Sequence, residues 1–166
     1  ERGSSGINIL WPETDNGDFK EQLKVVKEGN SPNNISPIIK YSCAAKFIWM
    51  GDLETDYLEK VKDEIEFEGI DVLFAPHHGR ESGKIPSDIL EILNPKVIVI
   101  GEAPSGNLNY YAGYNTITQN SAGNIIFDAY DDTVDIYVGS SNYSVSFLDN
   151  NKKSAFNNYI GSFSTK

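Results

Sequence analysis

The chain has 166 residues, and its 14 Lys and Arg against 24 Asp and Glu give a formal net charge of −10. Such a surface repels nucleic acid and anionic lipid, so passive binding to either is excluded unless a local site or a bound metal reverses the sign. The single cysteine, Cys43, excludes an intrachain disulfide. No apolar run approaches the ~20 residues of a membrane span. These properties predict one globular domain, no membrane association and a cytoplasmic location.

The first third of the chain predicts a short strand followed by a hairpin. Ile7–Trp11 is a strand-like run that Pro12 stops. The Lys- and Glu-rich stretch Asp18–Glu28 fits either a short helix or a mobile loop. Beyond a Gly- and Asn-rich loop, Ile35–Tyr41 and Lys46–Met50 are predicted to pair across a short turn.

The middle of the chain alternates helix-like and strand-like segments. Apolar residues recur at helical spacing among charged ones from Thr55 to Glu68, and Gly69 is typical of a helix end. A buried strand is predicted at Ile70–Ala75, a helix at Pro86–Leu93 and a further buried strand at Lys96–Ile100. This alternation predicts an α/β fold.

The last third changes in composition. Asn107–Asn120 is a Tyr- and Asn-rich stretch that predicts a loop. Asn124–Phe127 and Thr133–Val138 alternate well enough to be paired strands. Residues 146–166 are polar and predict an adjunct strand with a loose tail.

Two of the hydrophobic runs stop on side chains that can bind metal. Phe47–Met50 is followed by Gly51 and Asp52, and Ile70–Ala75 is followed by Pro76 and the only two histidines, His77 and His78. A carboxylate in that position can bridge two metal ions, although Asp is also a common helix N-cap and a helix is predicted directly after it. Adjacent histidines at a strand end point in different directions, so one can ligate metal while the other contacts substrate.

Several of these segments together resemble one family, the metallo-β-lactamase-fold hydrolases. The branch most similar contains stand-alone hydrolases and the hydrolase domain of ComEC-type competence proteins. The resemblance covers roughly Ile7 to Phe127 and is carried by Ile9-Leu10-Trp11-Pro12, Asn33-Asn34-Ile35-Ser36, Gly51-Asp52, Pro76-His77-His78-Gly79 and the step from Leu93 to Ile100.

The resemblance implies roles for the residues of the two main motifs. Asp52 matches the metal-bridging aspartate, and His78 matches the last metal ligand. His77 then either adds to the metal site or faces the substrate as a catalytic side chain. Arg80 stands where the family often has Ser, and is either a second catalytic residue that holds a phosphate or a surface residue.

Three further residues are candidate substrate contacts. Asn33 lies where other branches have a histidine ligand, which implies a weak ligand or a hydrogen-bond partner. Ser82 follows the histidine motif and is a candidate phosphate contact. The branch often has a histidine in the loop after the last strand, and Tyr110 is the candidate to fill that space.

One family motif has no counterpart here. His-x-His-x-Asp-His, which supplies most ligands of the metal pair, is not in the sequence, because His77 and His78 are the only histidines. Residues 1–145 therefore resemble the C-terminal half of the family's αββα sandwich, a mixed sheet with flanking helices, and one sheet face is expected to be exposed. The missing half would come from the same polypeptide or from a separate chain. Alternatively, the chain is a metal-free interaction module with the Asn107–Tyr114 segment as its contact surface.

The function that the resemblance implies is metal-dependent hydrolysis. Two Zn²⁺ or Mn²⁺ ions would hold a hydroxide that attacks a phosphodiester, either a small one or nucleic acid. The acidic surface favours a small or narrow substrate over a long duplex. The same fold supports thioester and lactone hydrolysis, so those reactions stand as alternatives.

Overall fold

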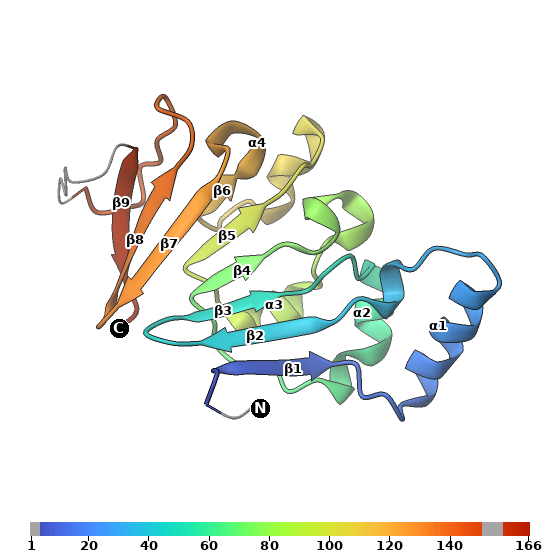
Figure 1. Cartoon of the computed structure of the whole chain (residues 1–166). Coiled ribbons are helices and arrows are strands. Elements are labelled where there is room, and N and C mark those ends of the chain that lie inside the picture. The colour runs from blue at the N-terminus through green and yellow to red at the C-terminus, as the bar shows by residue number, and fades with distance from the viewer. Residues whose placement is uncertain (1–3, 151–157) are drawn as a thin grey trace.

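The computed structural model describes residues 4–150 and 158–166 (Figure 1). It is a mixed α/β structure with a six-stranded sheet and a smaller three-stranded sheet. The predicted α/β class and the mixed sheet with flanking helices are confirmed. Among the described residues, no helix combines the length and apolarity needed to cross a lipid bilayer.

The six-stranded sheet has a simple order, in which each strand lies beside the next one along the chain. Its first two pairings are antiparallel and the remaining three are parallel. The strands are β1 (Ile7–Trp11), β2 (Ile38–Ser42), β3 (Lys46–Trp49), β4 (Val72–Phe74), β5 (Val97–Ile100) and β6 (Thr116–Thr118). Because β3 and β4 run side by side in parallel, the loops that follow them emerge at the same sheet edge.

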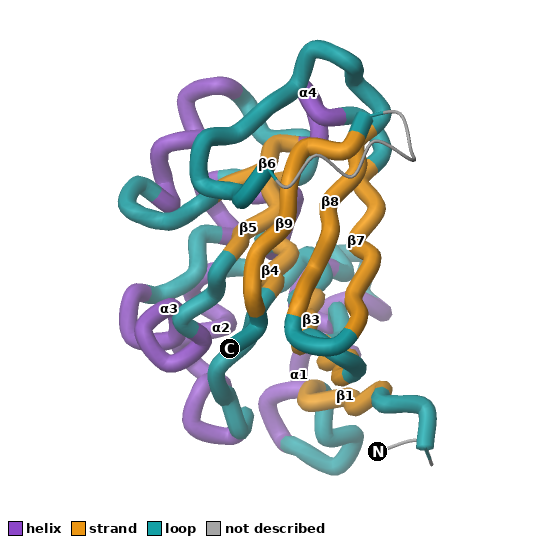
Figure 2. The backbone as a smooth tube through the Cα atoms, turned by 90° about the vertical axis from the view of Figure 1, so that its left-hand side faces the viewer, coloured by secondary structure: helices purple, strands orange, loops and turns teal. Residues whose placement is uncertain are grey.

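Helices cover one face of this sheet (Figure 2). They are α1 (Gly17–Lys27), α2 (Thr55–Val61) and α3 (Ser87–Leu93). The central strands direct Ile48, Leu73 and Ile98 into this layer, where all three side chains are fully buried among helix residues such as Leu58 and Leu93. Burying side chains of this size contributes about 1.5–3 kcal/mol each, which makes this layer the main core of the fold.

Two helical segments differ from what the sequence suggests. For the stretch Asp18–Glu28 the sequence allowed either a helix or a loop, and the structure has a helix there. The Asn16 side chain caps this helix, because it accepts hydrogen bonds from the amides of Asp18 and Phe19. The predicted helix Thr55–Glu68 is wrong beyond Val61. A 3₁₀ turn follows at Lys62–Glu64, and the chain is then extended so that Ile65 enters the core and Glu68 reaches the lysines of β2 and β3.

The Asn107–Asn120 stretch was predicted as a loop, and that is wrong. It contains part of the 3₁₀ helix Ser105–Tyr111, the strand β6 and the start of α4 (Gln119–Ala122). β6 pairs in parallel with β5, and the amide of Ile98 donates to the carbonyl of Asn115 at 2.8 Å. Ile117 is the only apolar residue in β6, so there was no alternation to indicate a strand.

A second, antiparallel sheet packs on the other face of the main sheet. It consists of β7 (Ile125–Tyr130), β8 (Thr133–Val138) and β9 (Tyr159–Ser164), so the predicted pairing of the two strands in this region is confirmed. Its apolar side chains, including Val134 and Ile136, are buried against Val97, Val99 and Ile117 of the main sheet. The expected open face is therefore covered over β4–β6 and at Phe47 of β3. With residues 4–150 and 158–166 considered, it stays exposed at Ile7 and Ile9 of β1 and at Trp49 of β3.

Glu68 joins the extended segment after α2 to the sheet and gives the fold a pH dependence. Its carboxylate forms ion pairs with Lys40 and with Lys46, the latter at 2.6 Å. The hydrogen bonds from Lys40 and then Lys46 lower the pKa of Glu68 to about 2. A carboxyl group whose pKa is lowered by folding stabilises the fold fully above its unfolded pKa of roughly 4.3 and loses that effect as the pH falls towards 2.

We expect Glu68→Gln to lower the free energy of unfolding by about 0.5–1 kcal/mol at pH 6, a modest value because the carboxylate is partly exposed and screened by solvent. The difference from the native protein should shrink between pH 4.5 and 2, where native Glu68 itself becomes protonated. Urea unfolding at several pH values measures both effects. Glu66→Gln is the control, since Glu66 is exposed and forms no ion pair in the described part of the chain. A constant difference across this pH range would contradict the assignment.

Candidate functional site

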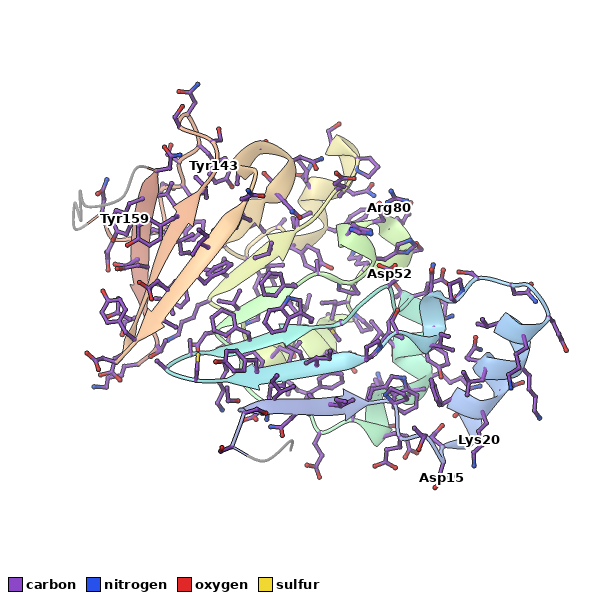
Figure 3. The ribbon with its side chains drawn as sticks, viewed as in Figure 1. Asp15, Lys20, Asp52, Arg80, Tyr143 and Tyr159 are labelled. Carbon is purple, nitrogen blue, oxygen red and sulfur yellow. The ribbon has the colours of Figure 1, made fainter. Side chains whose placement is uncertain are left out.

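The candidate site lies where the loops after β3 and β4 meet. Trp49 and Phe74 are partners in the parallel register, so Gly51-Asp52 and Pro76–Gly79 leave the sheet side by side. The amide of His77 donates to the carbonyl of Gly51 at 2.9 Å and fastens one loop to the other. Figure 3 shows Asp52 and Arg80 at this edge of the sheet, opposite the edge that carries the β2–β3 turn.

The backbone of Asp52 is fixed by neighbouring residues, while its side chain remains accessible to a ligand. Gly51 has a φ of +55°, and a Cβ at that position would lie 2.5 Å from the Cβ of Ser36. The Ser36 hydroxyl accepts a hydrogen bond from the Asp52 amide at 3.1 Å. The N-cap of α2 is Glu54, so Asp52 does not cap that helix. Its side chain is 45% exposed and can reach a ligand.

The two histidines occupy left-handed backbone conformations and their rings separate. His77 has φ 47° and ψ 44°, and His78 has φ 58° and ψ 12°. Each such residue costs of order 1–3 kcal/mol and persists only where neighbouring contacts fix it. Here the space is tight, because a Cβ on Gly101 would lie 3.2 Å from the His78 Cα and one on Gly83 would lie 2.5 Å from the His77 Cβ.

His78 turns towards Asp52, and His77 turns towards Ser82. The Nε2 of His78 lies 3.7 Å from Oδ1 of Asp52. The Nδ1 of His77 lies 2.9 Å from the Ser82 hydroxyl. Ser82 is itself fixed, because its carbonyl accepts a hydrogen bond from the Thr55 hydroxyl at 3.1 Å. The structure thus brings together the carboxylate and one imidazole, and gives the other imidazole a separate partner.

A cavity of about 250 Å³ opens beside Asp52 and His78. Two of its lining side chains, Trp49 and Gln119, were not among the residues singled out from the sequence. Trp49 lies in a hydrophobic strand and had the pattern of a core residue. Gln119 is at the start of α4, in the stretch predicted as a loop, so no local pattern pointed to it. Ser36 was also missed as a support for Asp52, although it belongs to the Asn-x-x-Ser segment.

The remaining predicted residues do not line this cavity. The Asn33 amide donates to the Glu54 carboxylate at 3.0 Å, so it is a hydrogen-bond partner of Glu54 in this structure. Arg80 is exposed, and within residues 4–150 and 158–166 its guanidinium has no ion pair. Tyr110 lies beneath Lys84, whose Nζ is 5.5 Å from the ring centre. Desolvation and the nearby Glu81 carboxylate raise the pKa of Tyr110.

The donors present suit a metal ion but are too few to enclose one. Carboxylate oxygen and imidazole nitrogen are ordinary ligands for Zn²⁺ and Mn²⁺, and a catalytic zinc ion usually has three protein ligands. Among the described residues, no group of three or more His, Cys, Asp and Glu is arranged to hold a metal ion. Asp52 and His78 can therefore supply only part of a metal site.

Comparisons with known proteins give no independent assignment. Neither a protein-family model nor a curated protein sequence matches the chain. The case for a function therefore depends on the geometry at the ends of β3 and β4 and on the motifs found there.

We expect Gly51→Ala to lower the free energy of unfolding by about 2 kcal/mol or more, because it adds a side chain at positive φ and against Ser36. Gly69→Ala is the matched control, since a Cβ there meets nothing within 4 Å and its φ lies outside the left-handed region. The control should change stability by less than about 1 kcal/mol in either direction. Urea unfolding compares the two variants. Equal effects would contradict the view that Gly51 is required to place Asp52.

Proposed function

We propose that this chain supplies the Asp52–His78 part of a metallo-β-lactamase-like hydrolase site that acts on phosphodiesters. The observation that carries the proposal is the 3.7 Å approach of an exposed carboxylate and an imidazole at the ends of two adjacent parallel strands. The ends of parallel strands are where α/β proteins commonly place catalytic groups. The Gly-Asp and Pro-His-His-Gly motifs that form this edge are the ones that resemble the family.

Metal ions fit the donors that this chain provides. Asp52 and His78 would hold Zn²⁺ or Mn²⁺, with the remaining ligands coming from polypeptide outside these 166 residues, as in the His-x-His-x-Asp-His motif of the family. When bound, such ions generate a nucleophile at neutral pH and neutralise charge on a phosphate. The left-handed turn holds the His78 ring towards Asp52 before any ligand binds, which lowers the entropy cost of forming the site.

The other side chains of the loop would act on the substrate. The Ser82 hydroxyl at Nδ1 fixes the ring of His77, which leaves Nε2 as the position for proton exchange with a leaving group. Arg80 is the side chain suited to pair with a phosphate, because its guanidinium is exposed and has no ion pair in the described part of the chain. The net charge of −10 favours a small phosphodiester over a long duplex.

The shortage of ligands favours a second candidate function. If nothing completes the site, Asp52 and His78 are remnants, and the chain is an interaction module that has lost its metals. The two candidates differ in what Asp52 does. In a hydrolase Asp52 is needed for metal and turnover, whereas in a module it is dispensable for partner binding.

We expect Asp52→Asn, made in the protein purified from its source with its native partners, to lose bound metal and to reduce hydrolysis of bis(4-nitrophenyl) phosphate by at least about 100-fold. The neutral amide removes the carboxylate charge that would hold a metal ion, with almost no change in shape. Metal analysis and initial rates measure the two effects. Asp63→Asn is the control. This substitution makes the same chemical change away from the site, because Asp63 is exposed on the turn after α2.

Two results would contradict the proposal. One is a native protein without metal and without activity towards phosphodiesters, thioesters or lactones, which would favour the interaction module. The other is equal activity of the Asp52 and Asp63 variants. Activity on a thioester or lactone alone, lost in Asp52→Asn, would keep a metal hydrolase but overturn the phosphodiester assignment.

A further inference from the structure

The loop after β4 that carries the two histidines is folded back on itself. We call residues 76–84 the histidine loop. Gly83 is buried, and a Cβ there would lie 2.5 Å from the His77 Cβ and 2.7 Å from the carbonyl oxygen of Pro76. The amide of Arg80 donates to the carbonyl of His77, and the amide of Gly83 donates to the carbonyl of Arg80. The end of the loop therefore lies against its beginning.

One short segment after β3 holds both ends of this loop. We call residues 51–55 the anchor segment. At the start of the histidine loop, the amide of His77 donates to the carbonyl of Gly51 at 2.9 Å. At the far end, the Thr55 hydroxyl donates to the carbonyl of Lys84 at 2.7 Å. The two segments are thus joined at two points, one made by backbone groups and the other by a side chain.

The Thr55 hydroxyl bonds outside its own helix. Thr55 is the first residue of α2, where a threonine side chain commonly bonds backbone groups of its own turn. Here it reaches the carbonyls of Ser82 and Lys84, which are 27 and 29 residues further along the chain. A hydroxyl has one hydrogen to donate, so the two carbonyls share it. Loss of this one group would therefore release both carbonyls.

Ser82 passes the restraint on to His77. The carbonyl of Ser82 is held by Thr55 at 3.1 Å, and its hydroxyl lies 2.9 Å from Nδ1 of His77. Because the serine side chain is short, a movement of the Ser82 backbone moves the hydroxyl by a similar distance. A movement of about 1 Å away from the ring would break the bond, since a contact beyond about 3.5 Å is no longer a hydrogen bond.

The core and the Asp52–His78 pair do not depend on the Thr55 hydroxyl. Ile85 follows the histidine loop directly and is only 1% exposed, so the core holds the chain at that point. The approach of His78 Nε2 to Asp52 involves neither Thr55 nor Ser82. Removing the hydroxyl should therefore loosen the Ser82 end of the loop and leave the rest of the site in place.

We propose that Thr55 is a positioning residue, which acts through Ser82 and holds the ring of His77 in place beside Asp52. The placement of the ring follows from the hydrogen bonds alone, and its use in catalysis rests on the function proposed above. A catalytic group must be held to within about 0.5 Å of its productive position. Because Thr55 and Asp52 belong to the same anchor segment, the hydroxyl fixes the separation between the carboxylate and the His77 ring.

NMR of the histidine rings in the native protein from its source tests the placement of the ring. Thr55→Val replaces the hydroxyl with a methyl group of similar size, whereas Thr55→Ser keeps the hydroxyl. We expect the His77 ring signal, identified with His77→Gln, to move in Thr55→Val towards its position in Ser82→Ala and to stay at its native position in Thr55→Ser. Adding Thr55→Val to Ser82→Ala should cause no further shift, because both changes act through one hydrogen bond.

Three further measurements make this result specific. The His78 ring signal should shift at least about 5-fold less than that of His77, because the restraint acts through one pair of neighbours. Thr14→Val makes the same chemical change in the exposed turn before α1 and should move neither signal. If the valine disturbs the fold, Thr55→Ala removes the hydroxyl with a smaller side chain. A His77 signal that stays in place without the hydroxyl, that moves equally in Thr55→Ser, or that moves no more than the His78 signal would overturn the proposal.

Hydrolysis of bis(4-nitrophenyl) phosphate tests the use of this placement in catalysis. We expect Thr55→Val to lower kcat about 10-fold, with KM changed by less than about 2-fold and bound metal unchanged, because only the ring that exchanges protons is displaced. Thr55→Ser should restore kcat to within about 3-fold of the native value. An unchanged kcat in Thr55→Val, in a protein whose His77 signal moves, would overturn the catalytic role.

The two measurements separate this inference from the proposed function. A native protein without metal or hydrolysis would remove the proposed function, while the ring signals would still decide whether Thr55 places His77. Hydrolysis that depends on Asp52, together with a His77 signal that does not respond to loss of the hydroxyl, would keep the hydrolase and overturn the role of Thr55.

Discussion

The parallel pairing of β3 with β4 is the constraint on which the candidate site depends. It places the ends of two distant segments next to each other, and the hydrogen bond from the His77 amide to the Gly51 carbonyl joins the loops that follow. Every other feature of the site is arranged around this junction. Ser36 holds the amide of Asp52 from one side, and Gly101 leaves room for the His78 backbone on the other.

The two faces of the main sheet have different roles in the molecule. The face under α1–α3 is closed by side chains of this chain and supplies most of the stabilising apolar burial. The opposite face is closed over β4–β6 by the three-stranded sheet, and in the part of the chain that the structure describes it is exposed at Ile7, Ile9 and Trp49 of β1 and β3. The site lies at the boundary of the closed and exposed parts, because Trp49 and Phe74 line both its cavity and the larger one beside β7.

Much of the fold could be predicted from the sequence because its central strands are uninterrupted apolar runs with clear ends. The runs before Asp52 and His77 are of this kind, and Gly51 and Pro76 marked where the turns begin. Such clear apolar runs were absent in two segments, and the prediction from the sequence was wrong there. β6 has only Ile117 in the core, and α2 is followed by Ile65 and Phe67 at spacings that also suit a helix.

The site was predicted in part for a related reason. Asp52 and the histidines could be recognised because they follow strands, but which ring faces Asp52 is decided by two left-handed residues that no local pattern reveals. Ser36 and Gln119 reach the site from segments far away in the sequence, so only the tertiary structure shows their positions. Asn33, Ser82 and Tyr110 lie near the site, yet each is engaged with a different neighbour.

Among the residues that the structure describes, β7 is a terminal strand of its sheet and borders an apolar surface, which has a consequence for the behaviour of the chain in solution. An uncovered strand edge is a template for pairing with other copies, and repulsion between chains of net charge −10 opposes that encounter. The range of the repulsion falls from about 10 Å at 0.1 M salt to about 3 Å at 1 M. Ionic strength therefore sets how strongly copies of the chain repel one another, and added salt brings the chain closer to precipitation.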